Sequence, residues 1–353
     1  MSTPCLLVMA GGTGGHIFPA LAVADALQAQ GWRIVWLGNP AGMEGKIVAD
    51  KGYPLAAMEF KSLRGKGLMR KLQLPLGLLA SCMRARQILR EVKPDVVLGM
   101  GGYISFPGGL MARMMGIPLV IHEQNAVAGM ANRWLAKIAS RVLTGFPQTL
   151  ANGAWVGNPI RTDIAQLPAP AERYAGRTGP LRLLVIGGSL GAQVLNEIVP
   201  LGLALIPMAE RPTVVHQSGK EHFYQLTTNY QDAAVIARCE AFIEDMSEQY
   251  AWADIVICRA GASTIAELTA AGLPALLIPY PSAVDDHQTV NARFLSEAGA
   301  AFLMAQATLT PATIAPIVRI GRAQLQTMAE IAHGLAKPEA TATVAEICKG
   351  LVS

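Results

Sequence analysis

Short apolar runs alternate with segments of helical periodicity along almost the whole chain. Runs that predict strands lie at residues 5–10, 33–37, 95–98, 118–122, 141–144, 181–186, 213–217, 233–237, 254–258 and 274–278. Between them, apolar residues recur at helical spacing over 19–30, 69–92 and 262–271, with Gly or Pro at the far ends. This alternation predicts an α/β protein whose parallel sheets are covered by helices on both faces.

One strand-turn-helix pattern occurs twice, about half a chain apart. Residues 6–16 read LLVMAGGTGGH and residues 183–192 read LLVIGGSLGA, in each case a buried strand, a glycine turn and a helix start. Between the copies, residues 165–180 are rich in Pro, Ala and Gly and lack periodicity, which is typical of a connection near a domain border. We therefore expect two doubly wound, Rossmann-like domains that face a cleft, with ligands bound at the carboxyl edges of the sheets.

Composition narrows the class of protein. Of the 353 residues, 52% are hydrophobic and 15% are charged, and the mean hydropathy is +0.34, so disorder is excluded and an apolar neighbour such as a membrane is suggested. No window offers the about 20 uninterrupted apolar residues that a spanning helix needs. The N-terminus lacks the basic region of a secretory signal, and the five cysteines are scattered without a CxxC pair. We therefore expect a cytosolic chain with reduced thiols.

The net charge of +4 conceals an asymmetry. Residues 61–93 contain nine basic side chains and one acid, a local charge of +8, so the rest of the chain sums to −4. The basic residues flank an apolar stretch, 72–83, which is typical of a segment that lies in an anionic membrane interface. A core helix with one basic solvated face is the alternative, and the lack of aromatic residues disfavours a nucleic-acid site. The predicted membrane contacts are Lys66, Arg70, Lys71, Leu74, Leu76, Leu78 and Leu79.

The first glycine turn, residues 11–15, predicts a phosphate or sugar contact. Glycines around Thr13 let the backbone bring amide N–H groups to a ligand at the start of a helix, whose dipole favours anions. A dinucleotide fingerprint is incomplete, because Ile17 stands where a glycine or alanine is needed and no acid closes the second strand. No P-loop motif occurs either. A turn required only for close strand-helix packing is the alternative.

Polar side chains follow two strands of the first half. His16 lies just after the glycine turn, where it could act as a base or as a donor to a ligand hydroxyl; a capping or packing role is the alternative. Residues 122–125, His-Glu-Gln-Asn, follow the apolar strand at 118–122, at the edge where doubly wound folds place their sites. Some of these four side chains are expected only to cap the next helix.

The second half offers a further anion site. Residues 261–267 follow a strand and open a helix, so Ser263 and Thr264 suit a diphosphate, and Glu267 could accept hydrogen bonds from a ribose diol. The alternative for Glu267 is a capping-box acid. Residues 285–288 could hold sugar hydroxyls or form a solvated loop. No D-x-D motif and no metal-ligand spacing occurs, so neither a catalytic metal nor a cofactor is predicted.

Six motifs together resemble those of one family. They are residues 11–16 with Phe18 and Pro19 following, 99–103 (GMGGY), 122–125 (HEQN), 157–161 (GNPIR), 187–189 (GGS) and 261–267 (GASTIAE). In order and spacing they resemble the MurG family, bacterial N-acetylglucosaminyltransferases of peptidoglycan synthesis with the two-domain GT-B fold. The resemblance implies an acceptor- and membrane-side domain over 1–161, joined by a C-terminal helix at 337–353, and a UDP-N-acetylglucosamine-binding domain over 162–336.

The resemblance also implies a reaction and its donor site. N-Acetylglucosamine would pass from UDP-N-acetylglucosamine to the 4-hydroxyl of an undecaprenyl-diphosphate-linked muramoyl-pentapeptide, with inversion, on the cytoplasmic face of the inner membrane. Donor-site positions of the family fall on Thr13, Gly14, Gly15, Asn125, Arg161, Ser189, Ile243, Ala262, Ser263, Thr264, Ile265, Ala266, Glu267 and Gln288. Ile243 would meet uracil through its backbone, Glu267 the ribose, and Ser189, with the hydroxyls at 263 and 264, the diphosphate. Residues 281–286 depart from the family pattern.

An inverting transfer needs a base and a way to hold the charge of the departing UDP. His16 is the first candidate for the base, with Glu123 and His122 behind it. Without a metal, helix N-termini and Arg161 or Arg259 would stabilise the diphosphate.

Two other classes of function stay open at this point. A UDP-sugar 2-epimerase shares the two-domain architecture, but it has no use for a lipid-facing basic and apolar segment. A non-enzymatic nucleotide-sugar-binding membrane scaffold would keep the glycine turns without the polar cluster at 122–125.

Replacing Lys66, Arg70 and Lys71 together by Gln is expected to weaken binding to anionic vesicles, because each basic residue near such a surface contributes about 1 kcal/mol. Vesicle sedimentation measures the loss, and UDP-sugar binding should stay intact. Unaltered vesicle binding would contradict a membrane-binding role for the basic segment.

Overall fold

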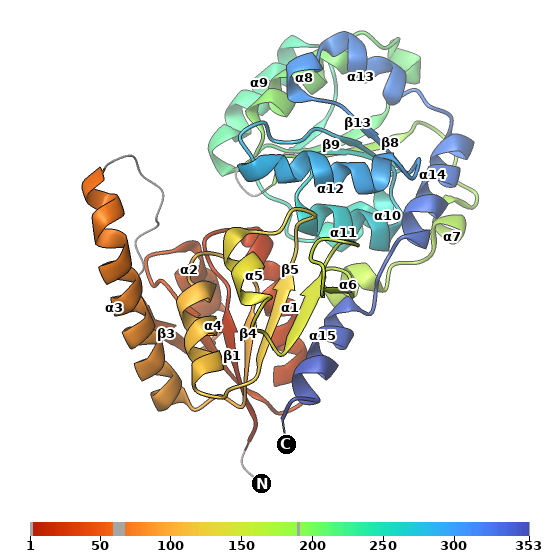
Figure 1. Cartoon of the computed structure of the whole chain (residues 1–353). Coiled ribbons are helices and arrows are strands. Elements are labelled where there is room, and N and C mark those ends of the chain that lie inside the picture. Colours follow the sequence, from red (N-terminus) through yellow and green to blue (C-terminus); the bar gives the residue numbers. More distant parts are fainter. Residues whose placement is uncertain (1–2, 59–67, 189–190, 353) are drawn as a thin grey trace. The chain divides into compact units, whose positions relative to one another are not determined.

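A computed structural model describes residues 3–58, 68–188 and 191–352 of the chain; within these, the side chains of 68–76 are outside the description. Contacts divide the chain into two compact units, Met1–Arg161 with Glu339–Ser353, and Thr162–Pro338. The C-terminal helix thus returns to the first unit. Each unit is a parallel sheet with helices packed on it (Figure 1).

The first unit is built on a seven-stranded sheet of order β3-β2-β1-β4-β5-β6-β7. Its strands are β1 (Cys5–Met9), β2 (Arg33–Gly38), β3 (Leu55–Ala57), β4 (Val96–Gly99), β5 (Leu119–Glu123), β6 (Arg141–Thr144) and β7 (Ala154–Trp155), and every neighbouring pair is parallel. Its helices are α1 (Gly14–Gln28), α2 (Met43–Asp50), α3 (Leu68–Val92), α4 (Ser105–Met114), α5 (Met130–Leu135) and α15 (Ala340–Lys349).

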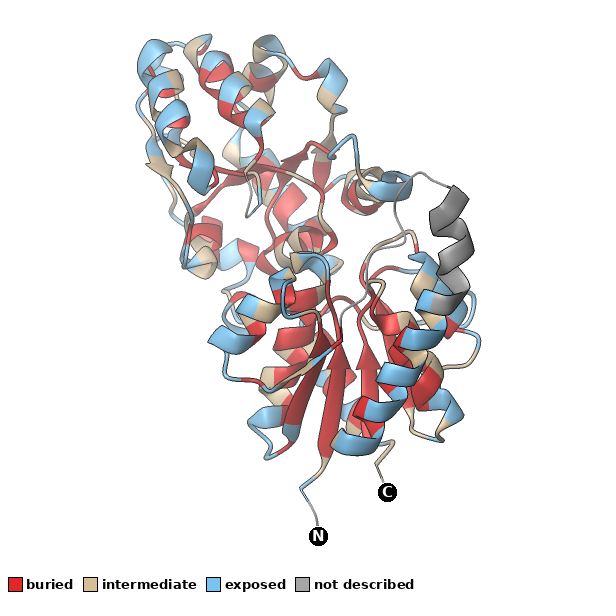
Figure 2. Cartoon of the chain, turned by 90° about the vertical axis from the view of Figure 1, so that its left-hand side faces the viewer, coloured by how far each residue is buried: buried red, intermediate tan, exposed pale blue. Residues whose placement is uncertain are grey.

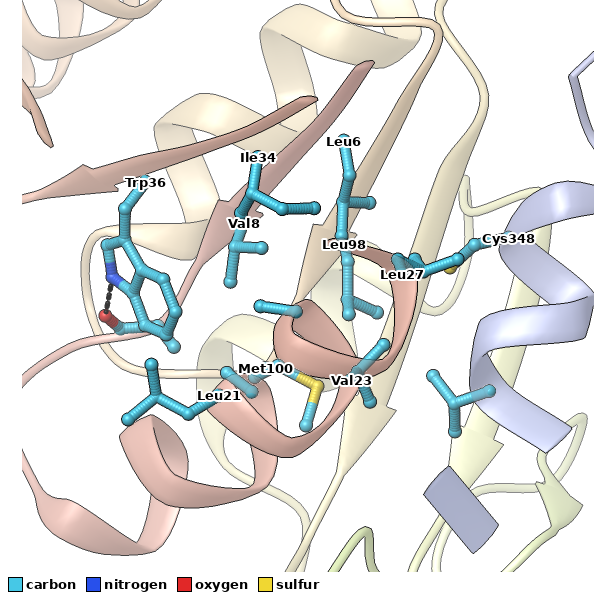
Figure 3. Packing of buried hydrophobic residues seen from close by; sticks show 14 of the residues in the cluster. Leu6, Val8, Leu21, Val23, Leu27, Ile34, Trp36, Leu98, Met100 and Cys348 are labelled. Atoms are coloured by element: carbon cyan, nitrogen blue, oxygen red, sulfur yellow. Dashed lines mark hydrogen bonds between the residues drawn. The ribbon is translucent and has the colours of Figure 1, made fainter. Parts of the chain in front are cut away.

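Alternate residues of β1 enter two separate cores in this unit. Leu6 and Val8 pack with α1, α15 and β2, and Leu7 packs on the opposite face with α3, α4 and α5. Figure 3 shows the first of these cores, in which the indole N–H of Trp36 donates to the carbonyl of Ala10 at 2.9 Å. Strands buried on both faces read as continuous apolar runs, which is why the sequence pattern locates them.

The second unit repeats the design with a six-stranded parallel sheet of order β10-β9-β8-β11-β12-β13. The strands are β8 (Arg182–Ile186), β9 (Thr213–Gln217), β10 (Arg238–Glu240), β11 (Ile255–Cys258), β12 (Ala275–Leu277) and β13 (Ala301–Leu303). The helices are α6 (Thr162–Ala165), α7 (Pro170–Tyr174), α8 (Gln193–Ala204), α9 (Phe223–Asp232), α10 (Met246–Trp252), α11 (Ala262–Ala271), α12 (His287–Ser296), α13 (Pro311–Ile317) and α14 (Arg322–Gly334). In both units the central strands are buried, while many helices expose one side (Figure 2).

The predicted α/β class and parallel sheets are confirmed, and two local predictions are wrong. Residues 233–237 do not form a strand, because Ala234 adopts a left-handed conformation (φ 51°) in the turn after α9, and the strand begins only at Arg238. Residues 165–180 are not a bare connection, because they include α7 and the buried Tyr174. The short strands β3, β7 and β13, of two or three residues each, lie at sheet edges and carry too little pattern to be predicted.

A buried ion triad fastens the segment after α7 to the second sheet. Asp254, which is fully buried, accepts hydrogen bonds from Arg177 Nη1 at 2.5 Å and Arg322 Nη2 at 3.0 Å. Its second oxygen also accepts from the backbone N–H of Arg182, the first residue of β8. One carboxylate therefore ties together the ends of β8 and β11, the start of α14 and the chain that enters the unit.

Asp254→Asn is expected to lower the free energy of unfolding by about 3–5 kcal/mol, because it leaves two desolvated guanidinium groups without their counter-charge. Urea denaturation measures the loss. The matched control is Glu240→Gln in the exposed pair with Arg238, where the cost should stay below about 1 kcal/mol. Equal costs for the two variants would contradict a structural role for the triad.

Candidate functional site

A buried carboxylate that was not predicted from the sequence accepts a hydrogen bond from the first glycine turn. Glu44, in the first turn of α2, is fully buried and accepts from Gly12 N at 3.1 Å with one oxygen and from Asn39 N at 3.1 Å with the other. Gly12 has a φ of 87°. The N–H of Gly12 is thus bonded within the protein and is not available to a ligand. The turn leads directly into α1, which begins at Gly14. The sequence signal for this carboxylate was an acid shortly after the second strand. It was missed because Glu44 follows the turn at residues 39–42 and does not stand at the end of the strand itself.

His16 lies in the first turn of α1 and is half-buried. Its Nδ1 is 2.7 Å from Oε1 of Gln124, which follows β5 and is fully buried. Residues 108 positions apart in the chain therefore meet, because β1 and β5 end at the same edge of the sheet. The sequence prediction of a polar cluster at this edge is consistent with that placement.

His122, a predicted catalytic candidate, is fully buried and bonded to its own unit. The side chain has no exposed surface; Nε2 is 2.8 Å from the carbonyl of Gly157, and Nδ1 is 3.0 Å from the Nε2 of Gln124. Burial lowers the pKa of His122 to about 4, although the bond to Gly157 and the charge of Glu123 act in the opposite direction. A neutral imidazole with both nitrogens bonded inside the protein supports its neighbours, and this placement disfavours the catalytic role predicted for His122.

Glu123 is likewise buried, and its carboxylate shapes the loop that follows β5. One oxygen accepts from Asn125 N at 3.0 Å, and the other accepts from Gly129 N at 3.0 Å and Asn132 Nδ2 at 2.9 Å. These bonds place Asn125 at the sheet edge. This placement favours a structural role for Glu123 over the predicted catalytic one, because its lone pairs are directed at backbone and amide donors of its own loop.

A glycine makes room for the imidazole of His16. Gly101 has a φ of 98°, and a Cβ there would stand 2.9 Å from Cε1 of His16. The motif at 99–103 is thus explained by contact with the first strand-helix turn. The backbone of the β4 loop at Gly101 and the side chain of Gln124 on the β5 loop thus border the same histidine.

In the second unit, α11 begins where the sequence analysis placed it. Its N-cap is Gly261, and Ala262 and Ile265 are buried against the core, whereas Ser263, Thr264 and Ala266 are partly exposed. The hydroxyl oxygen of Ser263 is buried and has no hydrogen-bond partner. Glu267 accepts from the hydroxyl of Tyr250 at 2.9 Å. A capping box would need the acid at the third helical position, which Thr264 occupies, so that alternative for Glu267 is wrong.

The remaining donor candidates are spread over several loops. Gln288, at the start of α12, accepts from Tyr280 N at 2.9 Å and Ala260 N at 3.3 Å, and Ile243 is buried. Arg259 donates to the carbonyls of Ile278 and Pro279 and to Gln306, which directs its guanidinium into its own unit. Arg161 and Thr13 are exposed, and Gly14, Gly15 and Asn125 lie at the sheet edge of the first unit. Ser189 lies outside the described residues.

Most of the residues predicted to contact a membrane lie outside the described residues or have side chains that are not described. Lys66 is not among the described residues, and Arg70, Lys71, Leu74 and Leu76 belong to the part of α3 whose side chains are not described. Leu78 is half-buried and Leu79 is exposed on the same helix. In the described part of the chain, no helix is long and apolar enough to cross a membrane. Nor do three or more His, Cys, Asp or Glu side chains gather there in a way that could hold a metal ion.

Comparison with known proteins places the chain in a family. The glycosyltransferase family 28 N-terminal domain matches residues 6–144, and the family 28 C-terminal domain matches 182–346. A crystal structure of MurG from Acinetobacter baumannii is 39% identical, covers 98% of this chain and 99% of its own, and superposes with a TM-score of 0.87. The chain belongs to the MurG family of glycosyltransferases. The predicted resemblance and the GT-B fold are confirmed.

Curated members of the MurG family are similar over nearly their full length. One from Dechloromonas aromatica is 60% identical over 97% of both chains, and one from Bordetella petrii is 55% identical over 99% of this chain and 98% of its own. Both are named UDP-N-acetylglucosamine–N-acetylmuramyl-(pentapeptide) pyrophosphoryl-undecaprenol N-acetylglucosamine transferase. The calicheamicin glycosyltransferase CalG4, 16% identical with a TM-score of 0.67, shares the fold alone.

In this MurG family member, stability is expected to fall as the pH drops from about 6.5 to about 4. Burial lowers the pKa of His122 to about 4 and that of His216, on β9, to about 3, whereas both take the ordinary value of about 6.5 when unfolded. The unfolded state then binds more protons in this interval, so acid favours unfolding, and above pH 6.5 these two groups contribute no slope. Denaturant titrations at several pH values measure the slope, which should be shallower in His216→Phe. A pH-independent free energy of unfolding across this interval would contradict the burial of both rings.

Proposed function

We propose that this chain transfers N-acetylglucosamine from UDP-N-acetylglucosamine to undecaprenyl-diphosphate-linked N-acetylmuramoyl-pentapeptide, forming the disaccharide precursor of peptidoglycan. The observation that carries the proposal is the 55–60% identity, over nearly the whole length, to relatives named for this reaction. The names of these relatives favour neither the epimerase nor the binding scaffold.

The first unit would supply the base for the acceptor. His16 lies at a sheet edge, half-buried, with Nδ1 engaged by Gln124. Its second ring nitrogen, Nε2, would take the proton of the acceptor 4-hydroxyl as that oxygen attacks the anomeric carbon. The glycosidic bond to UDP breaks on the opposite face of the sugar, so the configuration inverts.

The second unit would hold the donor. The start of α11 carries the partial positive charge of a helix N-terminus, and the unpartnered hydroxyl of Ser263 lies there, so a diphosphate would gain both a dipole and a donor. Thr264 and Ser189 would add hydroxyls, Glu267 would accept from the ribose, and the backbone of Ile243 would meet uracil. Ala262, Ile265 and Ala266 would shape this helix start, with Gln288 beside the sugar. In the first unit, Thr13, Gly14, Gly15, Asn125 and Arg161 are the proposed contacts.

The lipid-linked acceptor requires access to a membrane surface. The basic segment at 61–93 supports attachment to an anionic, cytoplasmic leaflet, and Leu79 and Met83 on α3 are 57% and 60% exposed. Helix α4, which packs on α3, adds Met114 at 70% exposure. Apolar side chains next to basic ones are suited to a peripheral contact.

The reaction is tested by measuring UDP release from UDP-N-acetylglucosamine with and without the lipid-linked muramoyl acceptor, in the presence of a chelator. We expect acceptor-dependent release that the chelator does not abolish. An isomerised UDP-sugar would indicate the epimerase, and the absence of turnover would indicate a binding protein.

His16→Ala should lower kcat on the order of 10²- to 10⁴-fold, the usual contribution of a general base, while donor binding changes little. Steady-state kinetics at saturating acceptor and calorimetric titration with UDP separate the two effects. A near-normal turnover would remove His16 from the mechanism.

Glu267→Ala should raise the donor KM about 10- to 100-fold with a smaller change in kcat, because a hydrogen bond to a charged group contributes roughly 1.5–3 kcal/mol. Tyr250→Phe is the matched control, since it removes the internal partner of Glu267 but keeps the carboxylate. An unchanged KM in Glu267→Ala would contradict the proposed contact between that carboxylate and the ribose.

A further inference from the structure

The amide of Gln124 has only one chemically possible orientation. Its Nε2 lies 2.9 Å from the backbone carbonyl of His122, and a carbonyl oxygen can only accept a hydrogen bond. The nitrogen must therefore face this carbonyl, and the amide oxygen must face the ring of His16 at 2.7 Å. Because that oxygen in turn can only accept, the Nδ1 of His16 must carry a proton.

A second imidazole closes the chain of bonds. The carbonyl of Gly157 accepts from Nε2 of His122 at 2.8 Å, so the proton of neutral His122 is on Nε2. Its Nδ1 then carries a lone pair, which accepts the second N–H of the Gln124 amide at 3.0 Å. All three groups thus have one consistent arrangement of protons, whereas the opposite orientation of the amide would place its oxygen against two acceptors of His122, the backbone carbonyl and the Nδ1 lone pair.

Burial makes this arrangement rigid. Gln124 and His122 have no exposed surface, so water cannot replace any of their bonds. The backbone on either side is also held, because the carbonyl of Gln124 accepts from Asn158 Nδ2 at 3.0 Å. Reorienting the amide would leave several buried polar groups unpaired, at about 1–3 kcal/mol each.

We infer that Gln124 is a positioning residue that holds neutral His16 in the Nδ1–H tautomer, with His122 and Gly157 fixing the orientation of the Gln124 amide. The lone pair of His16 is thereby kept on Nε2, the ring nitrogen directed away from Gln124. A neutral amide performs here the orienting task that a carboxylate performs in other histidine dyads, without adding a negative charge beside the base. The consequence for the reaction rests on the proposed role of His16 as the base, whereas the tautomer itself does not.

The tautomer is measured directly by nitrogen-15 NMR of the histidine rings in the whole chain, at about pH 8.5, where an ordinary histidine is neutral. The chain has six histidines, and a His16→Gln sample identifies the signals of His16. We expect a protonated Nδ1 and an unprotonated Nε2 in the wild-type protein. A wild-type His16 that is protonated on Nε2, or that averages between both forms, would overturn the inference without any variant having to fold.

Two substitutions at Gln124 separate orientation from structure. Gln124→Met has a similar shape and no acceptor, so His16 should lose its single tautomer, and kcat should fall on the order of 10-fold to 10²-fold with little change in either KM. Gln124→Glu restores an acceptor for Nδ1–H, and it should recover the tautomer and part of kcat. Loss of kcat in Gln124→Met with the His16 spectrum unchanged would contradict the positioning role.

Gln249→Met is the matched control, since Gln249 is a buried glutamine on α10 in the other unit. It reports the general cost of removing a buried amide, and it should leave the His16 signals as in the wild type. If His16→Ala retains turnover while wild-type His16 shows the Nδ1–H form, then the base assignment fails and the tautomer inference stands. If His16→Ala loses turnover while wild-type His16 lacks the Nδ1–H form, then the base assignment stands and the tautomer inference fails.

Discussion

Parallel strands all end at the same edge of their sheet, and the polar chemistry of this chain depends on that constraint. In the first unit, β1, β4 and β5 are neighbours, so the segments that follow them are brought together although they are far apart in sequence. His16 follows β1, Gly101 follows β4 and Gln124 follows β5. In the second unit the same rule places the start of α11 after β11, next to the segments that follow β8 and β12.

Burying polar groups at such an edge is costly unless every one of them finds a partner. Glu44 meets this requirement under the first glycine turn, where both of its oxygens accept backbone N–H groups. Glu123 does the same for the loop after β5. These carboxylates are surrounded by donors from their own unit, so they shape the backbone, whereas the nearby His16 keeps part of its surface exposed. The buried carboxylates and His16 therefore differ in how exposed they are and in how many of their polar atoms are already bonded.

In the second unit, a buried carboxylate is stabilised by two positively charged side chains. Asp254 accepts from two arginines and a backbone N–H, and this joins the incoming chain to β8, β11 and α14. Segment 165–180 reads as a connection because its composition is rich in Pro, Ala and Gly, yet its arginine and tyrosine side chains anchor it. Such long-range bonds leave no periodic trace in the sequence, because they depend on individual side chains and not on a repeated apolar spacing.

The sequence by itself determined the fold class, the positions of most strands, the repeated strand-turn-helix unit and the family, since these depend on local apolar patterns and on short motifs whose order can be read directly. It also brought His16, Glu123, His122 and Glu267 forward as candidates by their places after strands. Only the tertiary structure showed how deeply each of them is buried and what it is bonded to. Whether a carboxylate or an imidazole reacts or supports depends on its burial and on which lone pairs are already bonded, and those partners come from residues such as Glu44, Tyr250 and Gly157 that lie elsewhere in the chain.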